Sequence, residues 1–259
     1  MVLFNKPAAP GSGLLRYLPS MSAATIQPLA WDTEFFGFAV GRLVAAQLAR
    51  PELEHLLHEA RQAGYWVLYW SVAPDDAVSA GSAAAVGAVL ADRKIRLRLP
   101  VPAGQGVQLP PGIRPTTEFS PALQRLAPQA GESSRFQVDA QFGPEAYQRL
   151  YREWLRRSVA GELAREVLVY QPQLEEPAEG FLTLAEKNNR VEMVLMAVDA
   201  ARRGQGMGAA FIEAARCRAA AWGHSAVQLV TQATNPACRL YARQGFEMEH
   251  EEHVYHLWL

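Results

Sequence analysis

The sequence has no excess of basic residues. Among its 259 residues, 25 are lysine or arginine and 26 are aspartate or glutamate, so the formal net charge is −1. Proteins that bind nucleic acids usually carry a basic excess or stripe, because contacts to phosphates supply much of their affinity. This balance predicts a protein with no nucleic-acid partner.

Cysteine and long apolar segments are also scarce. Two cysteines, Cys217 and Cys238, cannot build a disulfide framework, so the expected compartment is the reducing cytoplasm. The longest uncharged run, residues 77–91, is rich in alanine and glycine and is shorter than the ~20 residues of a membrane-spanning helix. Prolines and glycines interrupt residues 1–20, which argues against a secretory signal. We therefore expect a cytoplasmic protein without a membrane partner.

The composition does favour a folded, globular chain. Hydrophobic residues make up 49% of the sequence and charged residues 20%, which is enough apolar surface for a sizeable core. Residues 100–115 contain five prolines and three glycines, a pattern typical of a boundary between two parts of a chain. We expect a flexible extension at residues 1–21, an N-terminal domain at 22–110 and a second domain at 111–259.

Hydrophobic periodicity predicts a mixed α/β protein. In the first part we expect a strand-like start at residues 26–43, helix at 51–61, strand at 65–72, an alanine-rich helix and a half-exposed strand at 92–99. In the second part we expect helices at 119–128, 144–158, 206–222 and 235–243, and strands at 166–170, 180–184, 191–198, 226–231 and 252–259. Hairpin-like strands followed by alternating strands and helices indicate a mixed sheet.

A glycine-rich turn carries the clearest chemical signal. Residues 198–209, VDAARRGQGMGA, lead from an apolar strand into the start of a helix. Backbone N–H groups at a helix start bind anions, and glycine lets a phosphate approach the backbone. The turn therefore predicts a phosphate or pyrophosphate site, to which Arg202 and Arg203 add charge.

Two other interpretations of this turn remain open. Gly204, Gly206 and Ala209 also satisfy the dinucleotide pattern G-x-G-x-x-A. Against a dinucleotide, residues 199–203 separate the glycines from the strand, and the next strand ends in Thr231 and Gln232 where an acid is needed for the ribose. A purely structural helix start is the other alternative.

The wider pattern resembles the GNAT superfamily of acyl-CoA-dependent N-acetyltransferases. It consists of Arg203-x-x-Gly206-x-Gly208 after an apolar strand, then Asn235, Leu240-Tyr241 and Gly245-Phe246. The resemblance implies that two parallel strands splay apart to admit acetyl-CoA. It assigns pantetheine binding to Leu195, Ala197 and Val198, and pyrophosphate binding to Arg202, Arg203, Gly204, Gln205, Gly206, Met207 and Gly208, with Asn235 and Tyr241 completing the cofactor site.

Further segments are similar to one group of that superfamily, the TDP-fucosamine acetyltransferases. They are PLAWDTEFFGF at residues 28–38, SSRF at 133–136, LYREW at 150–154, TQATN at 231–235 and YHLWL at 255–259. This resemblance implies an N-terminal partial GNAT-like domain before the catalytic domain. It also implies acetylation of the 4-amino group of a TDP-linked 4-amino-4,6-dideoxy sugar, made for surface polysaccharide.

The resemblance nominates Tyr241 as the general acid that protonates the departing thiolate. Backbone N–H groups near Ala197 and Val198 would polarise the thioester carbonyl. Asn235 lies six positions before Tyr241, where the family pattern has seven, so Thr234 is the alternative for its place. Glu192 is a candidate for orienting a water that accepts the amine proton, or else a solvent-side strand residue.

The acceptor is expected where the two domains meet, since clefts between domains commonly bind ligands. Trp31, Phe35 and Phe36 are candidates to stack on a sugar or base, although interface packing explains them equally well. Arg135 is a candidate to bind the nucleotide diphosphate. His250, His253 and His256 alternate faces along a strand, so we expect no metal site.

The leading hypothesis is therefore an acetyl-CoA-dependent N-acetyltransferase acting on a nucleotide-linked amino sugar, a small-molecule acceptor. Transfer to another amine, such as a protein N-terminus or a small metabolite, is the alternative within the enzyme class. A non-catalytic acyl-CoA-binding protein is the alternative outside it. The sequence leaves the oligomeric state open, a homodimer being one option.

Overall fold

A computed structural model describes residues 24–259, in which ten strands form one mixed sheet. The strand order is β1-β2-β3-β10-β4-β9-β8-β7-β6-β5. The strands are β1 (Thr25–Pro28), β2 (Val40–Val44), β3 (Val67–Val72), β4 (Val89–Pro100), β5 (Ile113–Thr116), β6 (Glu166–Tyr170), β7 (Gly180–Lys187), β8 (Arg190–Val198), β9 (Ala226–Gln232) and β10 (Glu247–Trp258). The predicted extension at residues 1–21 lies outside the described residues.

Helices alternate with these strands, as the predicted mixed α/β class requires. They are α1 (Ala30–Phe36), α2 (Arg50–Gln62), α3 (Ala77–Ala85), α4 (Pro121–Leu126), α5 (Arg135–Val138), α6 (Ala146–Val159), α7 (Met207–Ala221) and α8 (Cys238–Arg243). Three short 3-10 helices, η1 (Ala127–Gly131), η2 (Ala140–Phe142) and η3 (Ala200–Arg202), complete the set within residues 24–259. No helix in this range is long and apolar enough to cross a membrane.

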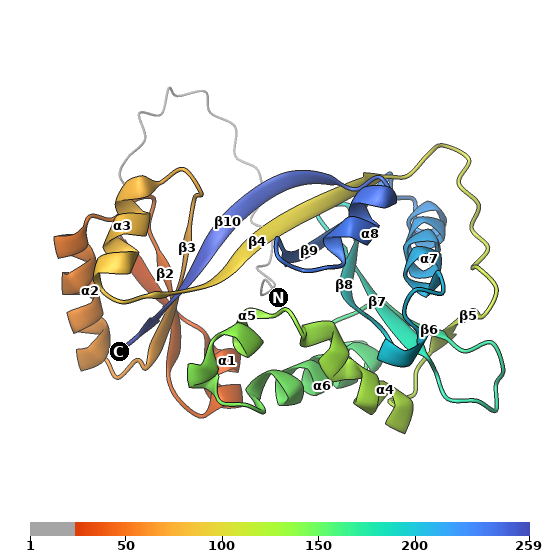
Figure 1. Cartoon of the computed structure of the whole chain (residues 1–259), viewed down its shortest axis with the longest axis horizontal. Helices are drawn as coiled ribbons and strands as arrows, with labels where there is room; N and C mark the ends of the chain where they lie inside the picture. The colour runs from red at the N-terminus through yellow and green to blue at the C-terminus, as the bar shows by residue number, and fades with distance from the viewer. Residues whose placement is uncertain (1–23) are drawn as a thin grey trace.

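Two long strands, β4 and β10, connect the two ends of the molecule (Figure 1). β4 pairs antiparallel with β9 on one side and with β10 on the other. The C-terminal strand β10 therefore lies between β3 and β4, both of which belong to the first part of the chain. The sheet runs without a break across the predicted boundary at residue 110, and the division into two domains stays a prediction.

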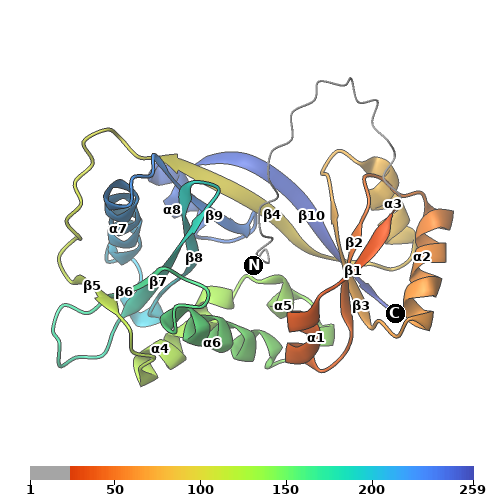
Figure 2. The same cartoon turned by 180° about the vertical axis from the view of Figure 1, so that it is seen from behind.

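Helices cover both faces of the sheet (Figures 1 and 2). On one face, α1, α4, α5 and α6 lie side by side, and a buried cluster that includes Phe136, Leu150 and Trp154 packs beneath them. On the other face, α7 covers a cluster that includes Phe211 and Val227. At the far end of that face, α2 and α3 cover Leu43 and Trp70. A cavity at the middle of the sheet is thus bordered by elements from both parts of the chain.

The expected strand-like start at residues 26–43 was wrong in its middle. Residues 30–36 form helix α1, and only 25–28 and 40–44 are strands. Trp31 and Phe35, one helical turn apart, stack with ring centroids 5.1 Å apart, and Gly37 ends the helix at φ 79°. The aromatic spacing in WDTEFF fits a helical face better than a strand.

Candidate active site

Two parallel strands separate at the centre of the sheet. β8 and β9 pair only from Val191 to Met193 on β8, opposite residues 227–229 on β9. β8 continues to Val198 and β9 to Gln232, so within the described residues the end of β8 is unpaired on this side. The splay predicted from the family resemblance is confirmed at this position of the sheet.

A β-bulge marks the point where the strands part. Thr183 of β7 pairs with Leu195 and the next residue, Leu184, pairs with Met193, so Val194 is the extra residue. The extra residue changes the face of the sheet on which the side chains before and after it lie. Met193 packs in the α7-side cluster, whereas Leu195 packs in the α6-side cluster.

The free edge of β8 offers backbone groups to a ligand. The Leu195 N–H donates to Thr183 Oγ1 at 3.0 Å and the Asp199 N–H donates to Glu179 O at 2.8 Å, both towards β7. Because backbone groups alternate along a strand, the N–H groups of Met196 and Val198 point to the open side. Met196 and Val198 lie within the segment 195–198 expected to bind pantetheine, while the Leu195 and Ala197 N–H groups are directed to β7.

The glycine turn after β8 leads directly into α7. Gly204 and Gly206 adopt φ values of 80° and 86°, and a Cβ on either would meet no atom within 4 Å. The first helical hydrogen bond joins the Ala210 N–H to Gly206 O, which leaves the preceding amides free at an exposed helix start. Gln205 is exposed, and Met207 anchors the helix through a buried side chain. The turn has the open, amide-lined shape that an anion site needs.

The two arginines of the turn are held by carboxylates. Arg202 pairs with Glu179 at 2.6 Å, and Arg203 pairs with Glu132 at 3.2 Å while donating to Val198 O. Their charge is therefore largely balanced within the protein. The backbone N–H groups of the turn remain as the main anion-binding groups.

Gly208 brings α8 close to the start of α7. A Cβ at this position would lie 2.7 Å from Leu240 Cδ2, so only glycine permits this packing without movement. Leu240 precedes Tyr241, which is buried and packs edge-to-face on Phe246 with centroids 5.5 Å apart. Burial, reinforced by the Cys238 thiol, raises the pKa of Tyr241 to about 12, so the phenol stays protonated at neutral pH.

Asn235 has a local role in the turn between β9 and α8. Its Oδ1 accepts from the Ala237 N–H at 2.9 Å, and its Nδ2 donates to Thr231 Oγ1 at 3.0 Å. Both functional groups of the side chain are thus engaged within the turn, an arrangement typical of Asx turns. Asn235 shapes the approach to Tyr241.

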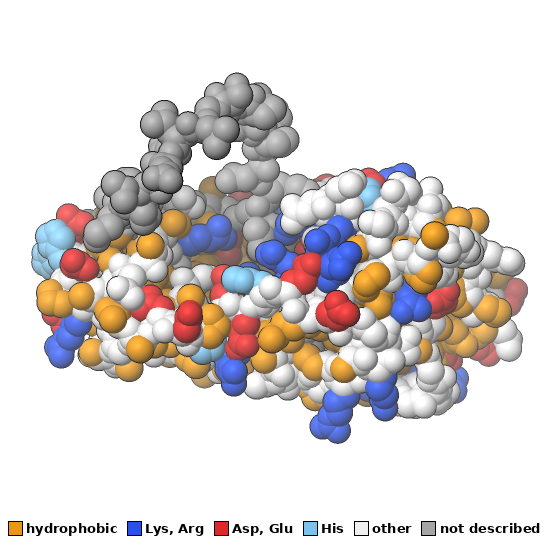
Figure 3. Space-filling model, turned by 90° about the horizontal axis from the view of Figure 1, so that it is seen from above, with side chains coloured by type: hydrophobic (Ala, Val, Ile, Leu, Met, Phe, Trp, Pro, Cys, Tyr) orange, Lys and Arg blue, Asp and Glu red, His pale blue; other side chains and the backbone are white. Residues whose placement is uncertain are grey.

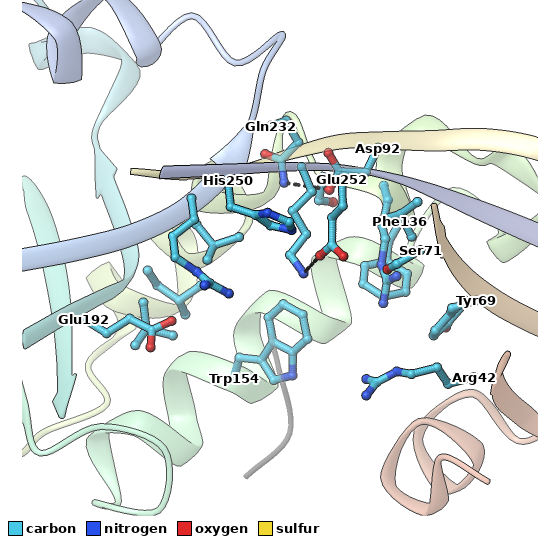
Figure 4. A pocket seen from close by; sticks show the side chains of 18 of the residues that line it. Arg42, Tyr69, Ser71, Asp92, Phe136, Trp154, Glu192, Gln232, His250 and Glu252 are labelled. Carbon is cyan, nitrogen blue, oxygen red and sulfur yellow. Dashed lines mark hydrogen bonds and ion pairs between the residues drawn. The ribbon is translucent and has the colours of Figure 1, made fainter. Parts of the chain in front are cut away.

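A cavity of about 460 Å³ lies on the α6 face of the sheet (Figure 4). Its floor is the polar face of several neighbouring strands, and its roof is formed by α5 and α6. The floor includes Arg42, Tyr69, Ser71, Asp92, Lys94, Arg96, Glu192, Val194, Val230, Gln232, His250 and Glu252, and the roof includes Ser134, Arg135, Phe136, Tyr151 and Trp154. The cavity reaches the splayed strands at Val194. It therefore lies next to the gap between β8 and β9.

Several buried polar atoms in this cavity lack a partner within residues 24–259. They are the hydroxyl of Tyr69, Oδ1 of Asp92 and Nε1 of Trp154. Asp92 is 7% exposed, and burial raises the pKa of its carboxyl although Gln232 donates to Oδ2 at 3.4 Å. Unpartnered buried polar groups are costly, so these atoms need hydrogen bonds from water or from a ligand in the cavity.

The cavity also has an excess of positive groups. Lys94 pairs with Glu252, whereas Arg42, Arg96 and Arg135 make no ion pair with the described residues. The Arg135 guanidinium lies over the Tyr69 ring, 4.1 Å from its centroid, which holds it at the cavity wall. These arginines suit a ligand that carries negative charge.

The structure separates the four residues predicted to bind the acceptor. Arg135 lines the cavity, but Trp31, Phe35 and Phe36 do not. Trp31 packs on Trp154 of α6 at 6.3 Å between centroids, and Phe36 packs on Phe142 at 4.9 Å. These contacts attach α1 to the layer of α5 and α6, and Trp31 and Phe35 also line a second, separate hollow, so their role toward an acceptor stays a prediction.

Glu192 lines the cavity near the splay, as its candidate role requires. Its Oε2 lies 3.5 Å from Lys187 Nζ and 3.3 Å from Gln228 Nε2. Asp92, Lys94 and His250 line the same cavity but were missed. The alternation of residues 92–99 placed Asp92 and Lys94 on a polar face, and only the position of β10 beside β4 shows that a cavity covers that face.

Charged side chains of both signs are interspersed over the face shown in Figure 3, with small basic clusters near its middle. Across the described residues many charged side chains are paired, for example Arg93 with Glu251 and Arg190 with Glu249. Within residues 24–259, no group of three or more His, Cys, Asp or Glu side chains is placed to hold a metal ion. Among the described residues, the cavity arginines are positive groups without an ion-pair partner.

Comparisons with known proteins agree with this geometry. Residues 164–248 match the model of the acetyltransferase (GNAT) domain. The chain is 26% identical over 231 residues to a dTDP-fucosamine acetyltransferase of Escherichia coli. The matched region covers 87% of this chain and 95% of the relative.

Solved structures share the fold at low sequence identity. A functionally unknown conserved protein from Staphylococcus epidermidis has a TM-score of 0.61 at 13% identity, covering 85% of this chain and 84% of its own. A GCN5-related N-acetyltransferase from Sphaerobacter thermophilus has a TM-score of 0.54 at 15% identity, covering 90% and 76%. The matched domain contains the splayed strands, the glycine turn and Tyr241.

Proposed function

We propose that this acyltransferase, in which residues 164–248 match the acetyltransferase (GNAT) domain, transfers acetyl to the amine of a nucleotide-linked amino-deoxy sugar. The proposed reaction is direct transfer from acetyl-CoA within a ternary complex. The division into an N-terminal GNAT-like part and a catalytic part, and a cytoplasmic location, belong to the same proposal.

The observation that carries the proposal is the placement of two sites on opposite faces of one splayed pair of strands. Tyr241 and Met193 both belong to the α7-side cluster, whereas the cavity opens on the α6 side at Val194. An amine in the cavity would approach the gap from one face. Tyr241 would meet the departing sulfur from the other face, which supports direct attack without a covalent enzyme intermediate.

The glycine turn and the β8 edge fit acetyl-CoA as co-substrate. Amides around Gly206 would bind its pyrophosphate, and the N–H groups of Met196 and Val198 would pair with its pantetheine arm. Tyr241 would donate a proton as the thiolate leaves, an action for which placement matters more than the raised pKa.

The cavity supports a polar, anionic acceptor. Tyr69, Asp92 and Trp154 present unpartnered polar atoms that suit hydroxyl groups, and Arg42 and Arg135 suit phosphates. The distant relative named dTDP-fucosamine acetyltransferase matches 87% of the chain, more than either part alone. A sugar nucleotide combines the hydroxyls, the amine and the negative charge in one ligand.

A panel of acceptors tests the proposal by release of CoA thiol from acetyl-CoA. We expect turnover with dTDP-4-amino-4,6-dideoxy sugars and little or none with the sugar hydroxyl analogues. Turnover restricted to a peptide N-terminus or a small metabolite amine would transfer the function to the alternative acceptor class. Binding of CoA without turnover of any amine would indicate the non-catalytic alternative.

A further inference from the structure

The sheet register places four cavity residues in one row at the point where the strands separate. Met193 and Leu229 form the last pair of β8 and β9, so Val194 and Val230 are the first residues beyond it. Val230 pairs with Arg96 of β4, and Arg96 pairs with His250 of β10. With neighbouring strands about 4.8 Å apart, this row crosses the floor of the cavity at the level of the splay.

A second β-bulge turns His250 into the cavity. Met248 pairs with Leu97 and His250 pairs with Arg96, so Glu249 is an extra residue on β10. Without it, Glu249 would lie opposite Arg96. Figure 4 shows the imidazole on the same side as Glu252, directed into the cavity. Bulges near active sites often re-aim a side chain in this way.

Two acidic groups of the cavity, Asp92 and Glu192, are less suited to take a proton at this level. Asp92 lies four positions along β4 from Arg96 (96 − 92), about 13 Å at 3.3 Å per residue. It is also buried, so it has no direct route to release a proton to water. Glu192 lies before the strands separate and contacts Lys187 and Gln228.

His250 combines position with access to solvent. It is an exposed residue that still lines the cavity, and histidine is the side chain that most often serves as a general base. The charged groups that face it are Arg96 and Lys94 of β4 and Glu252 of its own strand, with Glu192, Asp92 and Arg135 elsewhere on the cavity wall. An imidazole at this place could accept a proton inside the cavity and pass it to bulk water.

We propose that His250 is the general base of the acetyl transfer, a proposal that rests on the function proposed above. The acceptor ammonium gives one proton to the imidazole, and the freed nitrogen lone pair forms a bond to the thioester carbonyl carbon. The C–S bond breaks, Tyr241 protonates the sulfur, and the tyrosinate regains a proton from the nitrogen side through solvent. The net products are the acetamide, CoA thiol and one proton released by His250.

The pH dependence of kcat/KM tests this assignment with dTDP-4-amino-4,6-dideoxygalactose as acceptor. The wild-type value is expected to rise with pH and to level off before the free amine itself predominates. His250→Asn is expected to lower kcat/KM at pH 7 by roughly 100-fold, within the usual range for general base catalysis. Its profile should keep rising with unit slope until the free amine itself predominates. His253→Asn, on the opposite face of the same strand, should retain the wild-type profile.

A weakly basic acceptor provides the second arm of the test. Hydroxylamine is largely unprotonated at pH 7.5, so transfer to it needs little help from a base. His250→Asn should therefore reduce transfer to the sugar amine much more than transfer to hydroxylamine. Equal losses with both acceptors, or an unchanged pH profile, would overturn the role of His250. If Glu192→Gln, and not His250→Asn, removes the plateau in the pH profile of kcat/KM, then Glu192 is the general base.

These results separate failure of the base from failure of the function. If the wild-type enzyme acetylates no nucleotide sugar, the acceptor proposal is wrong. The assignment of His250 as general base for that reaction is then wrong as well. If the wild-type enzyme is active and His250→Asn keeps its rate and profile, only the base assignment is wrong.

Discussion

Replacing His256 is expected to remove a large part of the acid sensitivity of folding. His256 is fully buried on β10, and its Nδ1 lies 2.7 Å from Asp139 Oδ2. Burial lowers the pKa of His256 from 6.5 to about 4, even though the hydrogen bond to Asp139 acts in the opposite direction. The folded protein therefore holds this imidazole neutral.

The sign follows from proton binding in the two states. Below pH 6.5 the unfolded chain protonates this histidine and the folded chain does not, so stability is fully present above pH 6.5 and is lost as pH falls towards 4. From pH 7.5 to 5 the loss due to this group is about 2 kcal/mol, obtained from the two pKa values by linkage. The pKa of Asp139 is lowered from 3.8, so that group adds little in this window.

Urea unfolding of the wild type and His256→Asn at pH 7.5, 6 and 5 measures the difference. The variant is expected to be less stable at pH 7.5 because it disrupts a buried contact, but its stability should fall by about 2 kcal/mol less between pH 7.5 and 5. His253→Asn serves as the control, with the wild-type slope. Parallel slopes for the wild type and His256→Asn would refute the buried, neutral state of this histidine.

Three further changes test the two ligand sites. Tyr241→Phe should lower kcat by at least tenfold and leave the dissociation constant of acetyl-CoA within about twofold, as stopped-flow and calorimetry would show; an unchanged kcat removes the general acid. Gly206→Val should weaken CoA binding, because its φ of 86° costs a non-glycine residue about 1–2 kcal/mol; normal binding by calorimetry would move the pyrophosphate site elsewhere. Arg135→Gln should raise the KM of the sugar nucleotide by roughly 10–100-fold with little effect on acetyl-CoA, whereas Arg149→Gln, outside the cavity, should not; equal effects would contradict a phosphate contact by Arg135.

The cofactor side of the site was predictable because its signal is local. A strand, a glycine turn and a helix start are adjacent in sequence, and the positive φ values of Gly204 and Gly206 explain why glycine is needed there. Tyr241 follows at a short distance in the same unit. The bulge at Val194, by contrast, arises from the pairing of β7 with β8, and no residue type in this segment predicts it.

The acceptor side was only partly predictable because it depends on long-range pairing. β10 inserts between β3 and β4, which brings His250 and Glu252 beside Lys94, about 158 positions away in the chain. Sequence periodicity identified the polar face of β4 but could not show that α5 and α6 cover it. The aromatic residues of WDTEFF were candidates for stacking on a ligand because of their residue type. In the structure their helical spacing packs α1 against α6.

A competition between acceptors tests the proposed substrate most directly. The enzyme and acetyl-CoA are incubated with a mixture of dTDP-4-amino-4,6-dideoxy sugars, the corresponding free amino sugars and a peptide amine. Mass spectrometry of the products then reports which acceptor gains an acetyl group. Acetylated sugar nucleotide is the expected dominant product, and Arg135→Gln should lose this preference. Acetylation of the peptide or of the free sugars in preference to the nucleotide-linked sugar would contradict the proposed substrate.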